Sequence, residues 1–173
     1  MAENVALPPA SSPPITGLGL APLGCLLGAL ASQPGPVPKY RYPSAGTLYP
    51  VQAYLILRQP LEGLGAGTYY HDPDGHSLVP VSGAVPAAPD GSAPPALLAL
   101  VAQTAAIAPI YGEHAGDFSL LEAGYMYQAL CGAGSGLVLR DAGDPAGNQA
   151  LRAACGLEDS HVPLVCLAIG ENA

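Results

Sequence analysis

Positively charged side chains are scarce in this chain. Five lysines and arginines stand against thirteen aspartates and glutamates, and the formal net charge is −8. This balance argues against nucleic acid and anionic membrane surfaces as partners. Apolar runs long enough to span a bilayer are also missing, and no cationic segment precedes an apolar one near the N-terminus. We therefore expect a cytoplasmic protein with no membrane span and no signal peptide.

Close cysteine pairs of the CxxC type are absent, although the chain has four cysteines. The scattered spacing is not that of a metal cluster. We expect buried thiols in a reducing cytosol at Cys25, Cys131, Cys155 and Cys166. His71 and His76 flank an Asp-Gly turn, but the pattern offers them no third ligand. We expect them to be solvated turn histidines rather than metal ligands.

Apolar residues, glycine and proline are abundant. Half of the 173 residues are hydrophobic, which is enough for one domain with a buried core. The 22 glycines and 20 prolines predict long loops. Residues 1–15 are rich in proline and alanine and low in charge, so we interpret them as the flexible tail or linker of an excised domain. The folded domain is expected over residues 16–173.

The apolar pattern predicts a helix, then strands, a long helix and a last strand. Leucines from residue 23 on recur at i, i+3, i+4 and i+7, which indicates one face of a short helix weakened by Gly24 and Gly28. Strands are predicted where β-branched and aromatic residues gather, at 51–58, 68–71, 77–81 and 162–169. Residues 145–155 suggest a short helix that Gly156 stops. This order indicates an α+β domain rather than repeated βαβ units.

Residues 117–133 form the clearest predicted helix. The run Ser119-Leu120-Leu121-Glu122 fits a capping box before an apolar segment, and acidic residues suit the positive end of the helix dipole. One stripe at helical spacing is interpreted as core packing; it consists of Leu120, Gly124, Tyr127 and Cys131.

The stretch that organises the chain is KYRYPSAGTLYPVQAY, residues 39–54. Lys39 and Arg41 supply two cations, and the small run 44–47 offers backbone that a ligand can approach closely. Flat faces with polar tips come from Tyr40, Tyr42, Tyr49 and Tyr54. The combination suits a flat, anionic, hydrogen-bonding ligand such as flavin mononucleotide (FMN). A tyrosine-rich turn that leads into a strand is the alternative.

The run from Arg41 to Pro50, RYPSAGTLYP, resembles the signature of nitroreductase-like flavoproteins of the SagB/McbC type. Taken with GTYYHDPDGHSL and AIAPIYGEHAGDFSLLEAGYMYQAL, it is most similar to the oxidase domains of nonribosomal peptide synthetases. The resemblance covers roughly residues 16–170. Those domains oxidise carrier-bound thiazolines or oxazolines to aromatic azoles, or desaturate related peptidyl rings.

The resemblance implies a nitroreductase-like fold, with a mixed or antiparallel central sheet flanked by helices and two subunits that share each flavin. Residues 51–58 would be a central strand. Residues 96–104 are almost wholly apolar, so periodicity leaves strand and helix open. The resemblance favours a buried strand that runs on into residues 105–109. It also implies that the long helix packs across a dimer interface, where Gly124 would permit close approach.

The resemblance further implies FMN as the cofactor and a carrier-tethered peptidyl ring as the substrate. Arg41 and the backbone of residues 44–46 would hold the ring and its ribityl arm. The full set of signature residues assigned to the cofactor is Arg41, Pro43, Ser44, Ala45, Gly46 and Leu48. Arg140 is a candidate for the phosphate, because arginine matches phosphate bidentately. The alternative for Arg140 is a surface arginine near Asp141.

Tyr111 and His114 are the catalytic candidates. Relatives often have Lys-Tyr where this chain has Ile110-Tyr111, and many carry paired N-terminal arginines, which residues 1–38 lack. A tyrosine hydroxyl ordinarily titrates near pH ~10 and a histidine near ~6.5, so tyrosine alone is a poor base at neutral pH. We therefore expect Tyr111 to orient the ring or relay the proton while His114 takes it up. A solvated loop position is the alternative for His114.

Three functions follow from these residues. The first is an FMN-dependent azoline oxidase that acts on a carrier-tethered peptide, within a homodimer or beside neighbouring synthetase domains. The second is a free-standing reductase of nitro or quinone compounds. The third is a degenerate oxidase domain kept as a docking module.

Overall fold

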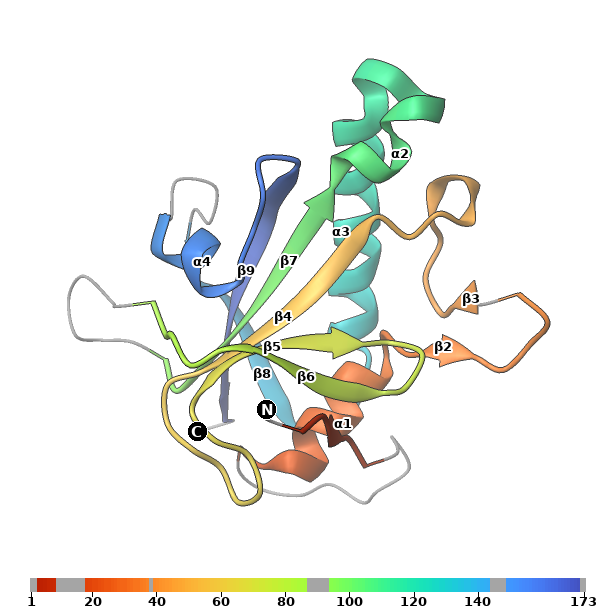
Figure 1. Ribbon diagram of the computed structural model, residues 1–173. Coiled ribbons are helices and arrows are strands. Elements are labelled where there is room, and N and C mark those ends of the chain that lie inside the picture. Colours follow the sequence, from red (N-terminus) through yellow and green to blue (C-terminus); the bar gives the residue numbers. More distant parts are fainter. Residues whose placement is uncertain (1–2, 9–17, 38, 87–93, 144–148, 172–173) are drawn as a thin grey trace.

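The computed structural model describes residues 3–8, 18–37, 39–86, 94–143 and 149–171. Its main feature is a seven-stranded sheet in the order β1-β6-β5-β4-β7-β9-β8, with every neighbouring pair antiparallel (Figure 1). The strands are β1 (Val5–Ala6), β4 (Val51–Leu57), β5 (Gly67–Asp72), β6 (Ser77–Ser82), β7 (Ala96–Gln103), β8 (Leu137–Asp141) and β9 (His161–Glu171). A separate short pair joins β2 (Ser32–Gln33) to β3 (Lys39–Tyr40).

Four α-helices accompany the sheet in the described residues: α1 (Leu20–Gly28), α2 (Thr104–Tyr111), α3 (Ala115–Cys131) and α4 (Gln149–Ala154). Two short 3₁₀ turns are η1 (Ala45–Thr47) and η2 (Gly112–His114). The predicted α+β class, the central position of residues 51–58 and the hairpin around residues 72–75 are confirmed. None of the described helices combines the length and the apolar character needed to cross a membrane.

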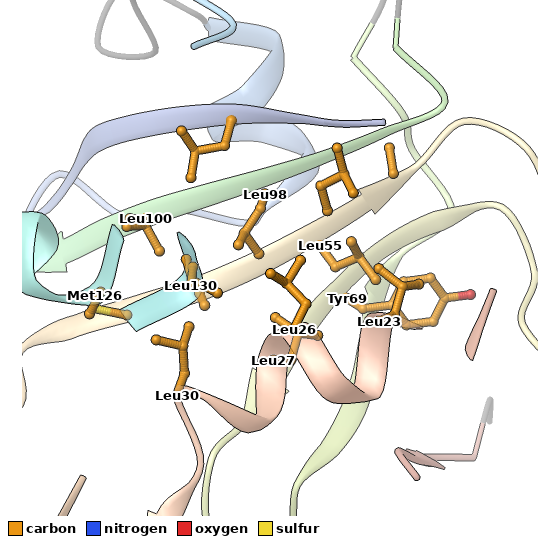
Figure 2. Close-up of a cluster of buried hydrophobic side chains, with 14 of the residues drawn as sticks. Leu23, Leu26, Leu27, Leu30, Leu55, Tyr69, Leu98, Leu100, Met126 and Leu130 are labelled. Atoms are coloured by element: carbon orange, nitrogen blue, oxygen red, sulfur yellow. The ribbon is translucent and has the colours of Figure 1, made fainter. Parts of the chain in front are cut away.

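The central strands β4 and β7 are buried on both sides of the sheet. Leu55 and Leu98 face one hydrophobic cluster with α1 and α3, whereas Ile56 and Ala99 face a second cluster with α4. Figure 2 shows the first cluster, in which leucines of α1 lie beside Leu55, Leu98, Leu100, Met126 and Leu130. A strand buried on both sides has no polar alternation, which is why the pattern of residues 96–104 left strand and helix open.

The short N-terminal helix forms as predicted, with Leu23, Leu26 and Leu27 at most 1% exposed. Gly24 does more there than weaken the helix. A Cβ at this position would stand 2.5 Å from the carbonyl oxygen of Pro8, so a side chain has no room. The glycine lets the N-terminal segment pass directly over α1.

The prediction that the strand continues through residues 105–109 is wrong. β7 ends at Gln103, and residues 104–111 form α2, with Pro109 inside the helix and Ile107 as its buried residue. Ala105 and Ala106 are exposed, so this segment has left the sheet. Two polar residues, Gln103 and Thr104, mark this boundary within the apolar run.

The long helix is confirmed, but two details of it were wrong. Ser119 lies inside α3 and donates to the carbonyl oxygen of Ala115 at 2.8 Å, so no capping box forms. The stripe predicted as core is exposed: Leu120 is 56% and Tyr127 39% exposed, and Cys131 is exposed as well. The helix instead turns Ala123, Met126 and Leu130 toward the sheet.

The expectation that His71 is solvated is also wrong, because its side chain is 1% exposed. His76 Nε2 lies 3.2 Å from the carbonyl oxygen of Pro8, to which it must donate. His76 Nδ1 is then an acceptor for the N–H of His71 Nε2, 3.3 Å away. The two rings therefore form a hydrogen-bonded chain that joins the N-terminal segment to the hairpin. The described residues contain no group of side chains that could hold a metal ion.

The burial of His71 predicts that acid destabilises the native state. Burial, with a further contribution from His76, lowers the pKa of His71 from 6.5 to about 3. The stability from neutral His71 is complete above pH 6.5 and is lost as pH falls toward 3. Unfolding by urea at pH 7 and pH 5 should show His71→Gln losing less stability on acidification than wild type, by up to ~1.4 kcal/mol per pH unit. The exposed His114→Gln is the control, and equal losses in all three proteins would contradict the account.

Candidate active site

The turn between β3 and β4 is built around Ser44. The N–H of Thr47 donates to the Ser44 carbonyl at 3.2 Å, and the N–H of Tyr49 donates to the Ser44 hydroxyl at 2.9 Å. Gly46 has φ 59°, Thr47 φ 57° and Tyr49 φ 48°, all in the left-handed region. Such a run is costly for residues other than glycine, so the surrounding bonds hold this conformation in place.

An aromatic cluster supports the turn from one side. The rings of Tyr40 and Tyr49 lie 4.1 Å apart edge to face, and Tyr42 stacks on Tyr40 at 5.6 Å. The N–H of Tyr40 also donates to the Tyr49 hydroxyl at 3.2 Å. Burial raises the pKa of Tyr42 above its usual range and that of Tyr40 to about 12. These hydroxyls therefore stay protonated at neutral pH, and the two rings support the turn rather than act as bases.

Tyr111 reaches this turn from a distant part of the chain. A Cβ built on Gly46 would lie 2.8 Å from the Tyr111 hydroxyl, and the Tyr111 ring packs on Phe118 at 4.6 Å. The sheet explains the meeting: Val51 pairs with Ala102, so the start of β4 and the end of β7 share one edge. The turn before β4 and α2 after β7 both emerge there (Figure 1).

The other predicted residues are placed differently. Arg41 is exposed and has no ion-pair partner among the described residues. His114 is 65% exposed, and its Nδ1 lies 3.4 Å from Asp117 Oδ2. Its Nε2 lies 4.0 Å from Glu113 Oε1, so the imidazole contacts acidic neighbours and not Tyr111. Pro43 and Leu48 are exposed beside the turn.

Arg140 lies away from the turn. Arg140 in β8 pairs with Ala168 in β9. Ala168 pairs in turn with Leu97 in β7, and Leu97 with Ile56 in β4. Ile56 is five residues along β4 from Val51, which at ~3.3 Å per residue and ~4.8 Å per strand separates Arg140 from the turn by roughly 20 Å. It is exposed and forms no ion pair with Asp141. Its assignment to the phosphate stays a prediction.

Glu122 is the site residue that the sequence reasoning missed. It lies in α3 and is 2% exposed, and its Oε1 accepts the N–H of Val51 at 3.2 Å. Burial raises its pKa to about 7, against the lowering effects of the Ser44 hydroxyl and the Val51 N–H. A signal was present: Glu122 shares the helical spacing of Ala115, Ser119 and Met126, the buried face of α3.

Comparison with known proteins places these features in a fold. No protein-family model matches the chain. An indigoidine synthase of Dickeya dadantii (strain 3937) is 37% identical over 104 residues, which are 60% of this chain and 7% of that protein. The chain therefore spans a small fraction of the length of this curated relative.

Three solved structures are similar along most of the chain. A candidate nitroreductase of Ralstonia eutropha JMP134 has a TM-score of 0.72 and 22% identity, over 98% of this chain and 90% of that one. The Escherichia coli microcin synthetase McbBCD complex with truncated pro-MccB17 has a TM-score of 0.74 and 22% identity, over 91% of this chain and 65% of that one. A candidate nitroreductase of Anabaena variabilis ATCC 29413 gives 0.73 and 18%, over 99% and 39%. This chain has the nitroreductase-like fold, as the RYPSAGTLYP motif predicted.

Proposed function

We propose that this chain binds FMN at the Gly46 turn and dehydrogenates a carrier-bound thiazoline, oxazoline or related peptidyl ring to the aromatic azole. The contact of the Tyr111 hydroxyl with Gly46 carries the proposal, because it brings a protic side chain to the turn that resembles the flavin signature. The likeness to an indigoidine synthase and to a microcin synthetase supports a synthetase context over a free-standing reductase.

The residues of the turn fit a flavin. The N–H groups of Ala45 and Gly46 donate to no acceptor among the described residues, so they are available to a ligand. Arg41 offers a guanidinium that no carboxylate neutralises in the described part of the chain. Gly46 presents bare backbone at an exposed position. Donors, cation and backbone together match the carbonyls and the anionic arm of FMN.

Dehydrogenation of an azoline removes a proton from one ring carbon and a hydride from its neighbour. FMN, when bound, accepts the hydride. The chain must position the ring and take the proton. Tyr111 is suited to orient the ring or relay the proton, since its hydroxyl is at the turn and its ring is braced by Phe118. His114, on the exposed η2 turn three residues on, is the proposed final acceptor.

The partners are proposed on the exposed face of α3. Leu120, Leu121 and Tyr125 are each about half exposed there. A hollow of about 370 Å³ lies between this face and β9. A second copy of the chain or a neighbouring synthetase domain would cover these side chains. The net charge of −8 repels an acidic carrier in solution, so we propose that the substrate is delivered by a carrier in the same assembly.

Stopped-flow reduction of the bound flavin by a thiazoline thioester tests this function. The wild type should reduce its flavin without a nicotinamide cofactor and pass the electrons to oxygen. Tyr111→Phe should slow the reduction by roughly 10²–10⁴-fold, the usual contribution of a positioned proton-transfer group. His114→Gln should lose the acid limb of the pH profile.

The same assay separates the alternatives. Rapid flavin reduction by a nicotinamide cofactor, with none by the thioester, would indicate a free-standing reductase. Failure of both reductants in a flavin-loaded protein would indicate a docking module. A normal rate and acid limb in His114→Gln would remove that residue from the mechanism and leave Tyr111 to be judged by its own variant.

A further inference from the structure

Glu122 joins three elements at the base of the flavin turn. It comes from the middle of α3, and its Oε1 accepts the N–H of Val51 at the start of β4. The Ser44 hydroxyl of the turn is close enough to lower the pKa of the Glu122 carboxyl, against the larger effect of burial. Its Oε2 has no hydrogen-bond partner in the described part of the chain, although the side chain is 2% exposed. A buried carboxyl oxygen without a partner is costly, which points to a function beyond packing.

The surroundings of Glu122 hold little charge. From the turn, Tyr42 is the titratable neighbour, and the charge of Glu122 adds to burial in raising the pKa of that tyrosine. Ser119 of the same helix is occupied by the Ala115 carbonyl. The strand β7, which packs on α3, is apolar from Ala96 to Ala102. Within the described residues, no cation is among the groups that shift the pKa of Glu122.

The Ser44 hydroxyl has one hydrogen to donate. Its oxygen already accepts the N–H of Tyr49 at 2.9 Å. When Glu122 is a carboxylate, the Ser44 hydroxyl can turn its hydrogen toward the unpartnered Oε2 and so stabilise the buried charge. When Glu122 is neutral, its own O–H can donate to Ser44, whose oxygen has a second lone pair. The hydrogen of Ser44 is then free to point out of the turn.

We propose that Glu122 is a positioning residue that sets the direction of the Ser44 hydroxyl: as a neutral acid it frees Ser44 to donate to FMN, and as a carboxylate it withdraws that donor. The inference rests on the proposed function, because the ligand of Ser44 is the flavin. It makes flavin affinity sensitive to pH near neutrality, which agrees with a pKa raised to about 7 by burial.

The test is the FMN dissociation constant of the full chain from pH 6 to pH 8, measured by flavin fluorescence for wild type, Glu122→Gln and Ser44→Ala. Between pH 6 and pH 8, the dissociation constant of the wild type should rise about tenfold more than that of Glu122→Gln, since the wild type loses one hydrogen bond to FMN. The FMN phosphate titrates in the same way with all three proteins, so the difference between their binding profiles reports on Glu122 alone. Ser44→Ala should show no such step. It also removes the acceptor of the Tyr49 N–H, so at pH 6 it should bind at least as weakly as the wild type does at pH 8.

An independent readout uses the protein without FMN. The infrared band of a protonated carboxyl should titrate near pH 7 in wild type and be missing in Glu122→Gln. Parallel binding profiles for wild type and Glu122→Gln, or no such band, would overturn this inference alone. Failure of the wild type to bind FMN at any pH would overturn the proposed function and the inference together.

Discussion

Gly46→Ala is expected to weaken FMN binding by about a hundredfold. Gly46 has φ 59° and ψ 15°, and the left-handed region costs an alanine ~1–2 kcal/mol. The new Cβ would also meet the Tyr111 hydroxyl at 2.8 Å, so either the turn or the Tyr111 side chain must shift. The strain alone corresponds to roughly a 5- to 30-fold change in the dissociation constant, and the displacement of the Tyr111 hydroxyl supplies the rest of the hundredfold. Equilibrium titration with FMN measures the change.

A double variant separates the clash from the backbone strain. Tyr111→Phe removes the oxygen that the new methyl group meets, so Gly46→Ala combined with Tyr111→Phe should bind FMN more tightly than Gly46→Ala alone. Such a coupling energy is expected for groups in contact. Gly116→Ala is the matched control, because a Cβ there meets nothing within 4 Å. Additive effects of the two substitutions would show that Tyr111 does not touch the turn.

Arg41→Ala is expected to weaken FMN binding by roughly 10- to 150-fold. A charged hydrogen bond lost at this position contributes ~1.5–3 kcal/mol. Because Arg41 is exposed and without an ion-pair partner in the described residues, its removal should leave the free energy of unfolding almost unchanged. The affinity of the wild type should also fall with salt more steeply than that of the variant.

Two neighbouring cations provide the controls. Lys39→Ala, in β3, removes an exposed charge close in sequence and should have a smaller effect. Arg140→Ala should have no effect within one subunit, given its distance from the turn along the sheet. Unchanged flavin occupancy in Arg41→Ala would contradict the assignment of Arg41. A large loss in Arg140→Ala would instead support the phosphate assignment and require a second subunit.

Local patterns were enough to predict much of the fold. The leucines of α1 repeat with a helical period, and β4 combines aliphatic and aromatic residues, so both elements follow from short-range preferences. The turn at Gly46 was predictable for the same reason, since small residues and tyrosines gather within a few positions. The resemblance of RYPSAGTLYP to a known signature then supplied the topology.

Contacts between distant elements could not be predicted. His71 reads as part of a polar hairpin, yet the Pro8 segment and His76 bury it. Ser119 and Glu122 fit a capping box because Glu122 follows Ser119 by three positions, but α3 begins earlier and turns the Glu122 carboxyl to Val51. The stripe through Leu120 is predicted as core because helical spacing shows which residues share a face. Spacing does not show whether that face points to the sheet or to solvent. Each of these errors concerns a side chain whose burial or exposure is decided by a distant element of the chain.

Equilibrium titration of the FMN-free chain with FMN tests the central claim most directly. The account predicts saturation at one FMN per chain, with quenched flavin fluorescence and the loss of affinity stated above in Gly46→Ala and Arg41→Ala. A wild-type chain that binds FMN no better than Gly46→Ala would contradict the claim that the turn at residues 44–49 is a flavin site.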